Sequence, residues 1–373
     1  MLPGGDAEFV FELRVCGWAE RHWPPESDAT DDTTSDATDD TTSDATDDTT
    51  SDATDDTTHF VARQLGTKRR RWDTVVVETD PAALKRRARF GRDRLDSDLL
   101  HVVRNAPVEW AWYRDALPHP GYPWQYVREA VHRADDRGVL DTRRNGNRIE
   151  IRRKWPYPDW VDRIVAIENK PDLDARAART LQPQLERDIA LSLADEVWVA
   201  TRETDRRVEP AMLEDIPVEA GILTVDGSAD SATVGWHPRS LSVGEPGTRI
   251  TDRPSNSEYD QSAARFEYVD PDEKATKRLE IAERAYERGW RSYADTMRPD
   301  CRQFELRAEN GQFLPWCAAK HRCQTAAECS GTCSSYEPEP PAWRQRGWPI
   351  EGGPGKRLQQ LLAERRDRKR PGE

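Results

Sequence analysis

The sequence predicts an α/β protein: a mixed sheet flanked by helices, with an inserted helix-and-hairpin unit and a small cysteine-rich C-terminal module. Helical and strand-like segments alternate from residue 164 to 225, a helix leads into a basic hairpin between 126 and 153, and five of the six cysteines lie at 301–333. The expected boundaries are 7–94 and 157–245 for two parts of one core domain, 26–58 for a disordered octad repeat within it, 95–156 for the inserted unit, 246–270 for a linker, 271–345 for a helix plus the cysteine module, and 346–373 for a basic, disordered tail.

The composition is that of a cytoplasmic protein rather than a membrane or secreted one. Of the 373 residues, 36% are apolar, which is enough to bury the cores of more than one domain. No segment approaches the roughly 18 consecutive apolar residues of a membrane-spanning helix, and the N-terminus lacks a basic segment followed by an apolar one. We therefore expect a cytoplasmic protein with no membrane partner.

Residues 27–58 consist of four identical copies of Ser-Asp-Ala-Thr-Asp-Asp-Thr-Thr. The repeat has no large apolar side chain, so burial cannot offset the entropy of ordering it, and we expect a disordered loop. Removing its twelve aspartates from the formal charge of −13 leaves −1 for the rest of the chain. The acidity of this protein is therefore a property of the repeat.

Positive charge gathers between residues 60 and 170, which hold 24 Lys and Arg against 16 Asp and Glu. The excess includes basic runs at 68–71, 85–87 and 152–154. Such clustering is typical of a surface that binds the phosphate backbone of nucleic acid. The alternative is a set of solvated helix faces without a partner.

One helix and two strands are expected around the repeat. Apolar side chains at helical spacing between residues 9 and 16 predict a first helix, which carries Glu12. Residues 60–65 predict a strand, and the β-branched run at 72–78 predicts a second, mostly buried one. Asp73 lies at its start. Because a buried carboxylate needs a partner, we interpret Asp73 as either a metal ligand or a strand-end cap.

The inserted unit reads as a helix followed by a basic hairpin. Residues 126–134 repeat apolar side chains at helical spacing and lead into the helix-stop signature Arg137-Gly138, while Asn145-Gly146 is a strong hairpin signal. This order is the closing half of a winged helix, whose last helix can enter a DNA major groove. The alternative is a winged helix that only packs against protein. In the first case, the hairpin would contact the DNA backbone through Arg143, Arg144, Arg148, Arg152 and Arg153.

The strand Ile164–Lys170 carries an acid and a base at one end. Four apolar residues indicate burial on both faces, and strand alternation then places Glu168 and Lys170 on the same face. Phosphodiester hydrolysis needs such a pair, because carboxylates hold Mg²⁺ and a lysine stabilises the charge that develops on the phosphate. The alternative is an ordinary ion pair at a strand end.

The segment after this strand completes the alternation of helices and strands. A helix is expected with Pro183 in its first turn, where a missing amide hydrogen is tolerated. A buried strand follows at 195–201, then a helix near Pro210–Ile216 and a strand at 221–225.

This order of elements resembles the PD-(D/E)XK, or restriction-endonuclease-like, nuclease superfamily: helix with Glu, strand with Asp, strand with Glu-x-Lys, helix with Gln, strand. The resemblance covers residues 8–22, 60–80 and 157–225. A closer similarity, at 157–173 and 184–197, is to an uncharacterised family of halophilic archaeal proteins. The resemblance implies a restriction-endonuclease-like mixed sheet and metal-dependent hydrolysis of phosphodiester bonds, with DNA as the expected partner.

The resemblance also implies roles for individual residues. Asp73 and Glu168 match the carboxylates that hold Mg²⁺ or Mn²⁺, and Lys170 matches the charge-stabilising base. Gln184 matches a helix glutamine that contacts nucleic acid or the site. Glu12 matches an optional acid of the first helix.

One departure concerns the spacing of the two metal-binding acids. The superfamily usually joins their strands by a short hairpin, whereas here the inserted unit would lie between Asp73 and Glu168. If the two do not meet, Asp159 of Pro158-Asp159 is the alternative acid.

The C-terminal cysteines predict a second metal site. They lie among Pro, Gly and polar residues, a setting with too few apolar side chains to fold by burial alone. Cytoplasmic thiols stay reduced, so a thiolate site is favoured over disulfides. Four thiolates suit Zn²⁺ and also suit a [4Fe–4S] cluster, which some nucleases of this superfamily hold with one cysteine from before the core and three from after it. The preferred ligands are Cys301, Cys317, Cys329 and Cys333, with Cys323 or Cys16 as alternates.

The function predicted from these residues is a metal-dependent nuclease acting on DNA. The alternative is a catalytically inactive DNA-binding or regulatory protein that keeps the nuclease fold and uses the winged helix.

Overall fold

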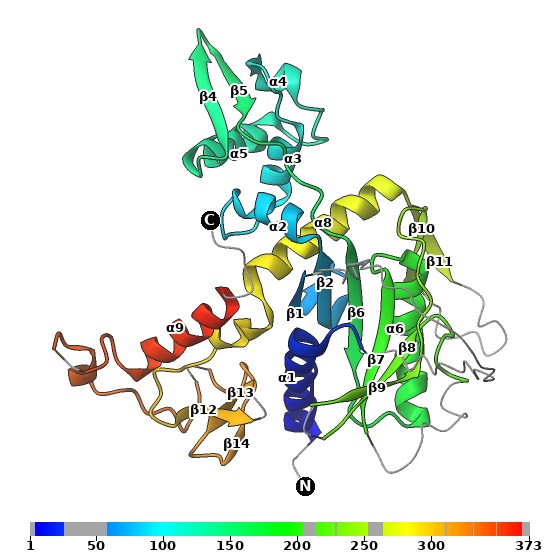
Figure 1. The fold of residues 1–373 in the computed structure, drawn as a ribbon, viewed down its shortest axis with the longest axis vertical. Coiled ribbons are helices and arrows are strands. Elements are labelled where there is room, and N and C mark those ends of the chain that lie inside the picture. The colour runs from blue at the N-terminus through cyan, green and yellow to red at the C-terminus, as the bar shows by residue number, and fades with distance from the viewer. Residues whose placement is uncertain are drawn as a thin grey trace, which may run out of the picture.

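The computed structural model describes residues 4–25, 58–203, 214–227, 230–252, 264–309, 312–330, 332–347 and 349–367. The octad repeat apart from Thr58, and most of the helix expected at 210–216, lie outside these ranges. A sheet domain forms the centre, an inserted unit projects from one end of it, and the C-terminal elements lie beside the first helix (Figure 1).

The central sheet has six strands in the order β1-β2-β6-β7-β8-β9. β6, β7 and β8 are parallel, whereas β1 with β2, β2 with β6 and β8 with β9 are antiparallel. The predicted mixed sheet is therefore confirmed, and β9 is a strand that the sequence did not predict. The bounds are β1 Thr58–Gly66, β2 Arg71–Thr79, β6 Arg163–Asn169, β7 Glu196–Arg202, β8 Gly221–Val225 and β9 Ala232–Trp236.

Helices cover both faces of this sheet, which explains why its central strands are apolar on both sides. α1 (Gly4–His22) packs on the face that includes Val76. α6 (Ala175–Leu191) and α8 (Pro271–Arg288) pack on the other face, which includes Val75. None of the helices within the described ranges is long and apolar enough to cross a membrane.

α6 begins earlier than the sequence indicated. Asp174 caps the helix, and its carboxylate accepts the N–H of Ala177 at 2.7 Å. Pro183 consequently lies in the middle of the helix, and its predicted place in the first turn is wrong. A proline there removes one backbone hydrogen bond, but Leu181 and Leu185 on either side of it are fully buried and keep the helix on the sheet.

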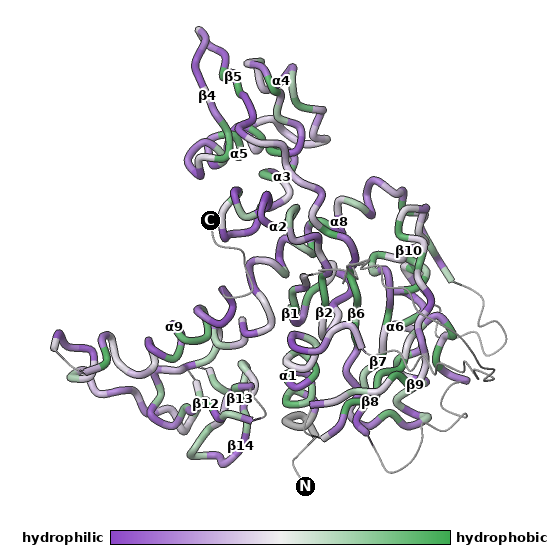
Figure 2. Tube along the Cα trace, in the orientation of Figure 1, coloured by the Kyte–Doolittle hydropathy of each residue, from purple (hydrophilic) through white to green (hydrophobic). Residues whose placement is uncertain are grey.

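The inserted unit lies between β2 and β6 and has an apolar core of its own. Its strands pair in the order β3-β5-β4. The predicted hairpin is present, with Asn145 opposite Arg148 and Gly146 at a φ of 60°. The tip of the hairpin is hydrophilic (Figure 2). The elements are α3 Ser97–Asn105, β3 Ala111–Trp112, α4 Tyr113–Ala116, α5 Trp124–Asp136, β4 Leu140–Asn145 and β5 Arg148–Arg153.

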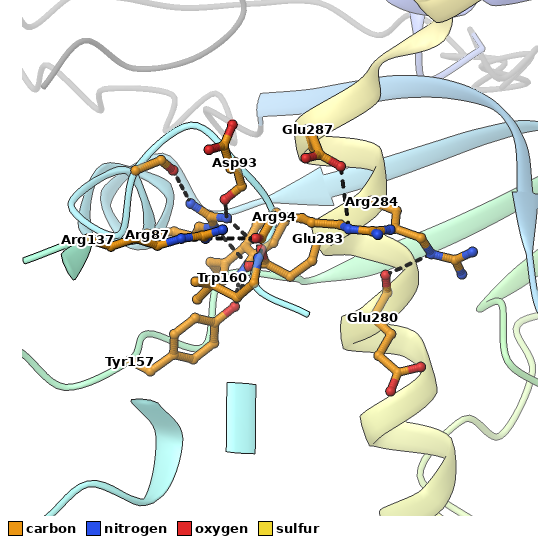
Figure 3. A network of polar contacts seen from close by, with 12 residues as sticks. Arg87, Asp93, Arg94, Arg137, Tyr157, Trp160, Glu280, Glu283, Arg284 and Glu287 are labelled. Carbon is orange, nitrogen blue, oxygen red and sulfur yellow. Dashed lines mark hydrogen bonds and ion pairs between the residues drawn. The ribbon is translucent and has the colours of Figure 1, made fainter. Parts of the chain in front are cut away.

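Both connections to the inserted unit are fastened to Glu283 of α8 (Figure 3). Arg87, in α2 (Pro81–Ala88), donates to Glu283 through Nε at 2.8 Å and Nη2 at 2.5 Å. The N–H of Leu95 donates to Glu283 Oε2 at 2.8 Å, and the hydroxyl of Tyr157 donates to Oε1 at 2.7 Å. Arg87 and Glu283 are both fully buried. Glu283 therefore binds the chain on its way into the inserted unit and on its way out.

The C-terminal third contains more regular structure than the sequence predicted. The expected linker at 246–270 holds the antiparallel pair β10 (Gly247–Asp252) and β11 (Arg265–Val269). The expected disordered tail holds α9 (Pro354–Asp367), whose Leu362 is buried in the core that α1 also enters. Both expectations are corrected. The remaining elements are η1 Trp290–Asp295, β12 Phe304–Glu309, β13 Gln312–Cys317, β14 Arg322–Cys323 and η2 Pro341–Arg344.

Candidate active site

Asp73 and Glu168 lie on neighbouring strands at the same end of the sheet. The antiparallel register of β2 and β6, continued by one step, places them opposite each other. Both side chains lie on the face covered by α6 and α8. Asp73 is two residues from Val75 and Glu168 is two residues from Ala166, and residues two apart in a strand share a face. The backbone N–H of Asn169 donates to Asp73 Oδ2 at 3.0 Å. Two carboxylates that are far apart in the sequence thus meet across one strand pair.

Glu168 is buried, with only 3% of the residue exposed. Burial raises the pKa of Glu168 to about 8, and the charge of Asp73 adds to this effect while Arg70 opposes it. Arg70 Nη2 lies 2.6 Å from Glu168 Oε1, but neither atom has a well-oriented hydrogen-bond partner among the described residues. A buried carboxyl with a raised pKa next to a second carboxylate is typical of a functional site.

Arg70 also binds Asp188, an acid of α6 that the sequence analysis did not single out. Its Nε lies 3.0 Å, and its Nη2 2.9 Å, from Asp188 Oδ2. Burial raises the pKa of Asp188, although Arg70 opposes the shift. Asp188 follows Gln184 by one helical turn, so helix periodicity applied to Gln184 would have found it. Arg70 belongs to the basic run at 68–71, which predicts a positively charged surface but not the contact of Arg70 with Asp188.

Gln64 connects Asp73 to Glu12 on α1. Its Nε2 donates to Glu12 Oε1 at 2.9 Å and to Asp73 Oδ1 at 3.1 Å. Gln64 has a φ of 54°, a left-handed conformation that costs a non-glycine residue on the order of 1 kcal/mol and is held by such contacts. Arg63 donates to both carboxylate oxygens of Glu12, each at 3.0 Å. Burial raises the pKa of Glu12 against the opposing effect of Arg63. We call Glu12, Asp73, Glu168 and Asp188 the acid cluster.

Lys170 lies just beyond the end of β6, and its ammonium group forms an ion pair with Glu8 of α1. The strand ends at Asn169, so strand alternation no longer determines where the Lys170 side chain points. The side chain is 32% exposed. Lys170 is therefore near the acid cluster along the chain but is paired with a different acid.

Two further residues of the predicted site, Asp159 and Gln184, form no hydrogen bond or ion pair with Glu168 in the described part of the chain. Asp159 is exposed and precedes β6, whereas Glu168 lies near the far end of that strand, and seven residues of strand span about 20 Å. The alternative that Asp159 replaces Asp73 is therefore wrong. Gln184 is half-buried in α6, and within the described part of the chain it makes no hydrogen bond to Asp73 or Glu168.

The acid cluster adjoins a large cleft with a volume of about 990 Å³, which we call the basic cleft. The β1–β2 turn, the C-terminal part of α6, the β10–β11 pair and α8 line it. Four acidic residues also line it, among them Asp188. Because Arg70 lines the cleft and contacts Glu168, it connects the cleft to the buried carboxylate. The eight basic residues of the lining are Lys68, Arg69, Arg70, Arg94, Arg187, Arg249, Lys277 and Arg284.

A family comparison covers most of the elements described above. The DUF5787 family, which is described as a family of unknown function, matches residues 60–338. The chain belongs to this family. No curated protein and no solved structure matches it. The range matched by DUF5787 includes Asp73, Glu168 and Asp188 but not Glu12, so it contains the centre of the acid cluster without the contribution of α1.

Three of the five hairpin arginines of this DUF5787 protein stack on two tryptophans. The guanidinium carbon of Arg143 lies 4.5 Å, and that of Arg152 4.8 Å, from the ring centre of Trp110. Arg148 lies 4.7 Å from the ring centre of Trp112. Such contacts fix the direction of each guanidinium group. Arg143 also pairs with Glu150 at 2.7 Å, and Arg152 with Asp141 at 2.8 Å. The five predicted arginines are distributed over both strands, Arg143 and Arg144 in β4 and Arg148, Arg152 and Arg153 in β5.

The DUF5787 range also contains the five C-terminal cysteines. Cys16 lies elsewhere: it is fully buried in α1, and its thiol contacts Thr74 Oγ1 at 3.3 Å. Its predicted role as an N-terminal cluster ligand is therefore wrong. Within the described ranges, no three His, Cys, Asp or Glu side chains are already spaced to hold a metal ion. Four cysteines nevertheless line one cavity of about 20 Å³, namely Cys301, Cys317, Cys329 and Cys333.

Proposed function

We propose that this protein is a metal-dependent nuclease that hydrolyses phosphodiester bonds in DNA at the acid cluster. The observation that carries the proposal is the position of Asp73 opposite Glu168 at the end of two central strands. Placing the buried carboxyl of Glu168 beside the half-buried carboxylate of Asp73 is costly unless a cation or a proton compensates their charge. The basic cleft beside them is suited to a polyanion.

The acid cluster fits a divalent cation held by Asp73 and Glu168. Glu168 Oε1 pairs with Arg70 Nη2 at 2.6 Å, so a divalent cation would replace that guanidinium group at the oxygen, and the neighbouring charge of Asp73 would favour it. Asp188 is held by Arg70, so water and phosphate oxygens would supply the ligands beyond Asp73 and Glu168, as is usual for Mg²⁺. A divalent cation at this position would polarise the phosphate and lower the pKa of a bound water.

Arg70 and Lys170 would bind and stabilise the phosphate. Arg70 contacts both Glu168 and Asp188 and also lines the basic cleft, so it is placed to transfer from these acids to an incoming phosphate. Lys170 pairs with Glu8 on an exposed part of α1. Released from Glu8, its ammonium group would stabilise negative charge that develops on the phosphate, which is the role of the matching lysine in PD-(D/E)XK nucleases.

The inserted unit supports DNA as the substrate. Its order of helices followed by the β4–β5 hairpin is that of a winged helix, and we infer that the hairpin contacts the DNA backbone. Arg143, Arg148 and Arg152 are held on tryptophan rings, so little side-chain entropy would be lost when they bind phosphates.

A cleavage assay with plasmid and single-stranded DNA, in Mg²⁺ or Mn²⁺, tests the proposal. Glu168→Gln and Asp73→Asn keep the size of the side chain but remove its charge, and each should lower the cleavage rate by at least about 100-fold. Asp159→Asn is the matched control, because this exposed acid lies at the other end of β6, and it should cleave like wild type. Equal cleavage by wild type, Glu168→Gln and Asp73→Asn would remove the assignment.

A second function is favoured by the pairing of Arg70 with Glu168 and of Lys170 with Glu8. In that case, the protein keeps the nuclease fold but binds DNA without cutting it. DNA binding would then weaken with salt, would not respond to Mg²⁺, and would be unchanged in Asp73→Ala. The cleavage assay above would find no metal-dependent activity in any variant.

A further inference from the structure

The segment after β14 is folded back on the β12–β13 hairpin without an apolar core. The described residues between 324 and 347 contain no buried apolar side chain. Ala326, Cys329 and Tyr336 are only partly buried against the main core. Polar contacts hold the rest, such as the bridge between Cys301 and Pro338 and the hydrogen bond from the N–H of Arg302 to the carbonyl of Glu337 at 2.8 Å. Burial alone therefore does not explain why this segment is ordered.

Four cysteines from separate parts of this module converge on one cavity. Cys301 precedes β12, Cys317 ends β13, and Cys329 and Cys333 lie in the turns after β14. All four line the cavity of about 20 Å³, and Cys329 lies within electrostatic range of the other three. Cys323 does not line this cavity.

Polar groups around the cavity are suited to negatively charged sulfur. The backbone N–H of Glu337 donates to Cys301 Sγ at 3.4 Å, and the backbone N–H of Arg298 donates to Cys329. The guanidinium group of Arg298 also lines the cavity and interacts electrostatically with Cys301. Amide hydrogens and a nearby cation are the groups that stabilise metal-bound thiolates.

We infer that Cys301, Cys317, Cys329 and Cys333 bind one zinc ion that holds this module together. The four thiols lose four protons to solvent when Zn²⁺ binds, and the resulting four-thiolate site carries two negative charges. Tetrahedral zinc requires sulfurs about 3.8 Å apart, given Zn–S distances of about 2.3 Å. No three such side chains in the described ranges are yet that close, so binding would draw the turns at 329 and 333 inward.

The size of the cavity favours a single ion over an iron–sulfur cluster. A volume of about 20 Å³ is close to the space that one water molecule needs. A [4Fe–4S] cluster has eight atoms, which is more than a cavity of this size can hold. The zinc inference does not depend on nuclease activity, because it concerns a different module of the chain.

The test is the metal content of the full chain purified with its thiols reduced. Elemental analysis should find one zinc per chain in wild type and a loss of that zinc in Cys329→Ser and in Cys333→Ser. Cys323→Ser is the matched control, since this cysteine belongs to the same module but does not line the cavity, and it should retain zinc. Circular dichroism of each variant establishes whether it folds.

A second measurement uses only wild-type protein and so avoids variants that fail to fold. Stepwise reaction of the folded chain with a mercurial should release one zinc as four thiols react. Iron and sulfide in place of zinc would overturn the inference, as would a metal-free protein in which all six thiols react freely. Loss of zinc from Cys323→Ser to the same degree as from Cys329→Ser would overturn the assignment of ligands.

Discussion

A proton on Glu168 couples the stability of this protein to pH. An unfolded glutamate carboxyl titrates near 4.5, whereas burial and the charge of Asp73 raise the pKa of folded Glu168 to about 8. Between these values the folded state binds one more proton than the unfolded state. The stabilising effect of that proton is fully present below about pH 4.5 and is lost as the pH rises to 8.

The variant Glu168→Gln should remove this dependence, because an amide does not titrate. In metal-free buffer, the unfolding free energy of wild type should carry a contribution from Glu168 that falls by roughly 1.4 kcal/mol per pH unit over this interval. Denaturant titrations from pH 5 to pH 8 measure it, and at pH 8 the variant should be the more stable protein. Asp159→Asn should leave the profile unchanged. Identical profiles for wild type and Glu168→Gln would contradict the buried, protonated state of Glu168.

A divalent cation at Asp73 and Glu168 would compete with the same proton. We therefore expect Mg²⁺ to raise the melting temperature of wild type more at pH 8 than at pH 6. The reason is that a smaller fraction of Glu168 carries a proton, which the cation must displace, at the higher pH. Thermal melts with and without Mg²⁺ test this, and Glu168→Gln should lose most of the shift. A shift that is equal at both pH values and in both proteins would place the cation elsewhere.

For individual residues, the sequence predicts which acids lie at strand ends, but it does not predict which basic side chains contact those acids. The β-branched runs of β2 and β6 indicate where each strand lies, so Asp73 and Glu168 could be recognised as carboxylates at buried strand ends. Arg70 lies in a turn, whose path no periodicity predicts. Lys170 follows the last residue of β6, so strand alternation alone does not determine the direction of its side chain, which pairs with Glu8.

Among the elements, long apolar patterns were predicted well and short or highly charged ones were not. Strands β2, β6, β7 and β8 lie within one or two residues of their expected bounds, because continuous apolar runs require burial on both faces. α9 was missed because only a narrow apolar stripe, which includes the buried Leu362, interrupts its charged residues. β10 and β11 were missed because their side chains are mostly exposed.

The buried pair of Arg87 and Glu283 should stabilise the attachment of α2 and the inserted unit to α8. Glu283→Ala removes the partner of a fully buried guanidinium group and the acceptor for Leu95 and Tyr157, so it should destabilise the fold by about 3–5 kcal/mol. Chemical denaturation measures the loss. Glu364→Ala is the matched control, because its pair with Arg357 is exposed and should contribute less than about 1 kcal/mol.

Two further variants separate this explanation from general fragility of α8. The double variant Arg87→Met with Glu283→Leu should recover part of the lost stability, because it leaves no unpaired buried charge. A loss for Glu283→Ala no larger than for Glu364→Ala would show that the connections are held by other contacts.

For the whole molecule, the distribution of charge matters more than its sum. The formal charge of −13 would argue against a polyanionic partner, yet eight basic residues line one cleft beside the acid cluster. The sequence could predict the local excess of positive charge, since it depends only on composition. It could not predict the cleft, because one wall is the β1–β2 turn and the others include β10, β11 and α8, which lie more than 170 residues later in the chain.

DNA binding should therefore depend on residues of the β1–β2 turn. In equilibrium titrations at several salt concentrations, Lys68→Ala and Arg69→Ala should each weaken binding, and each should lower the slope of log affinity against log salt by about 0.9 for one lost phosphate contact. Arg357→Ala on α9 is the matched control, because it does not line the cleft. Unchanged affinity and slope in the turn variants would exclude the basic cleft as the binding surface.

The position of the inserted unit has a consequence for how this chain can be rebuilt. β2 and β6 are antiparallel neighbours, so a tight turn of a few residues would suffice to join them, and the whole unit with its separate core takes the place of that turn. Both of the segments that connect it to the sheet are hydrogen-bonded to one residue of α8, Glu283. Removing the unit, or replacing it with a different recognition module at the same two connections, would leave every strand pairing of the central sheet intact.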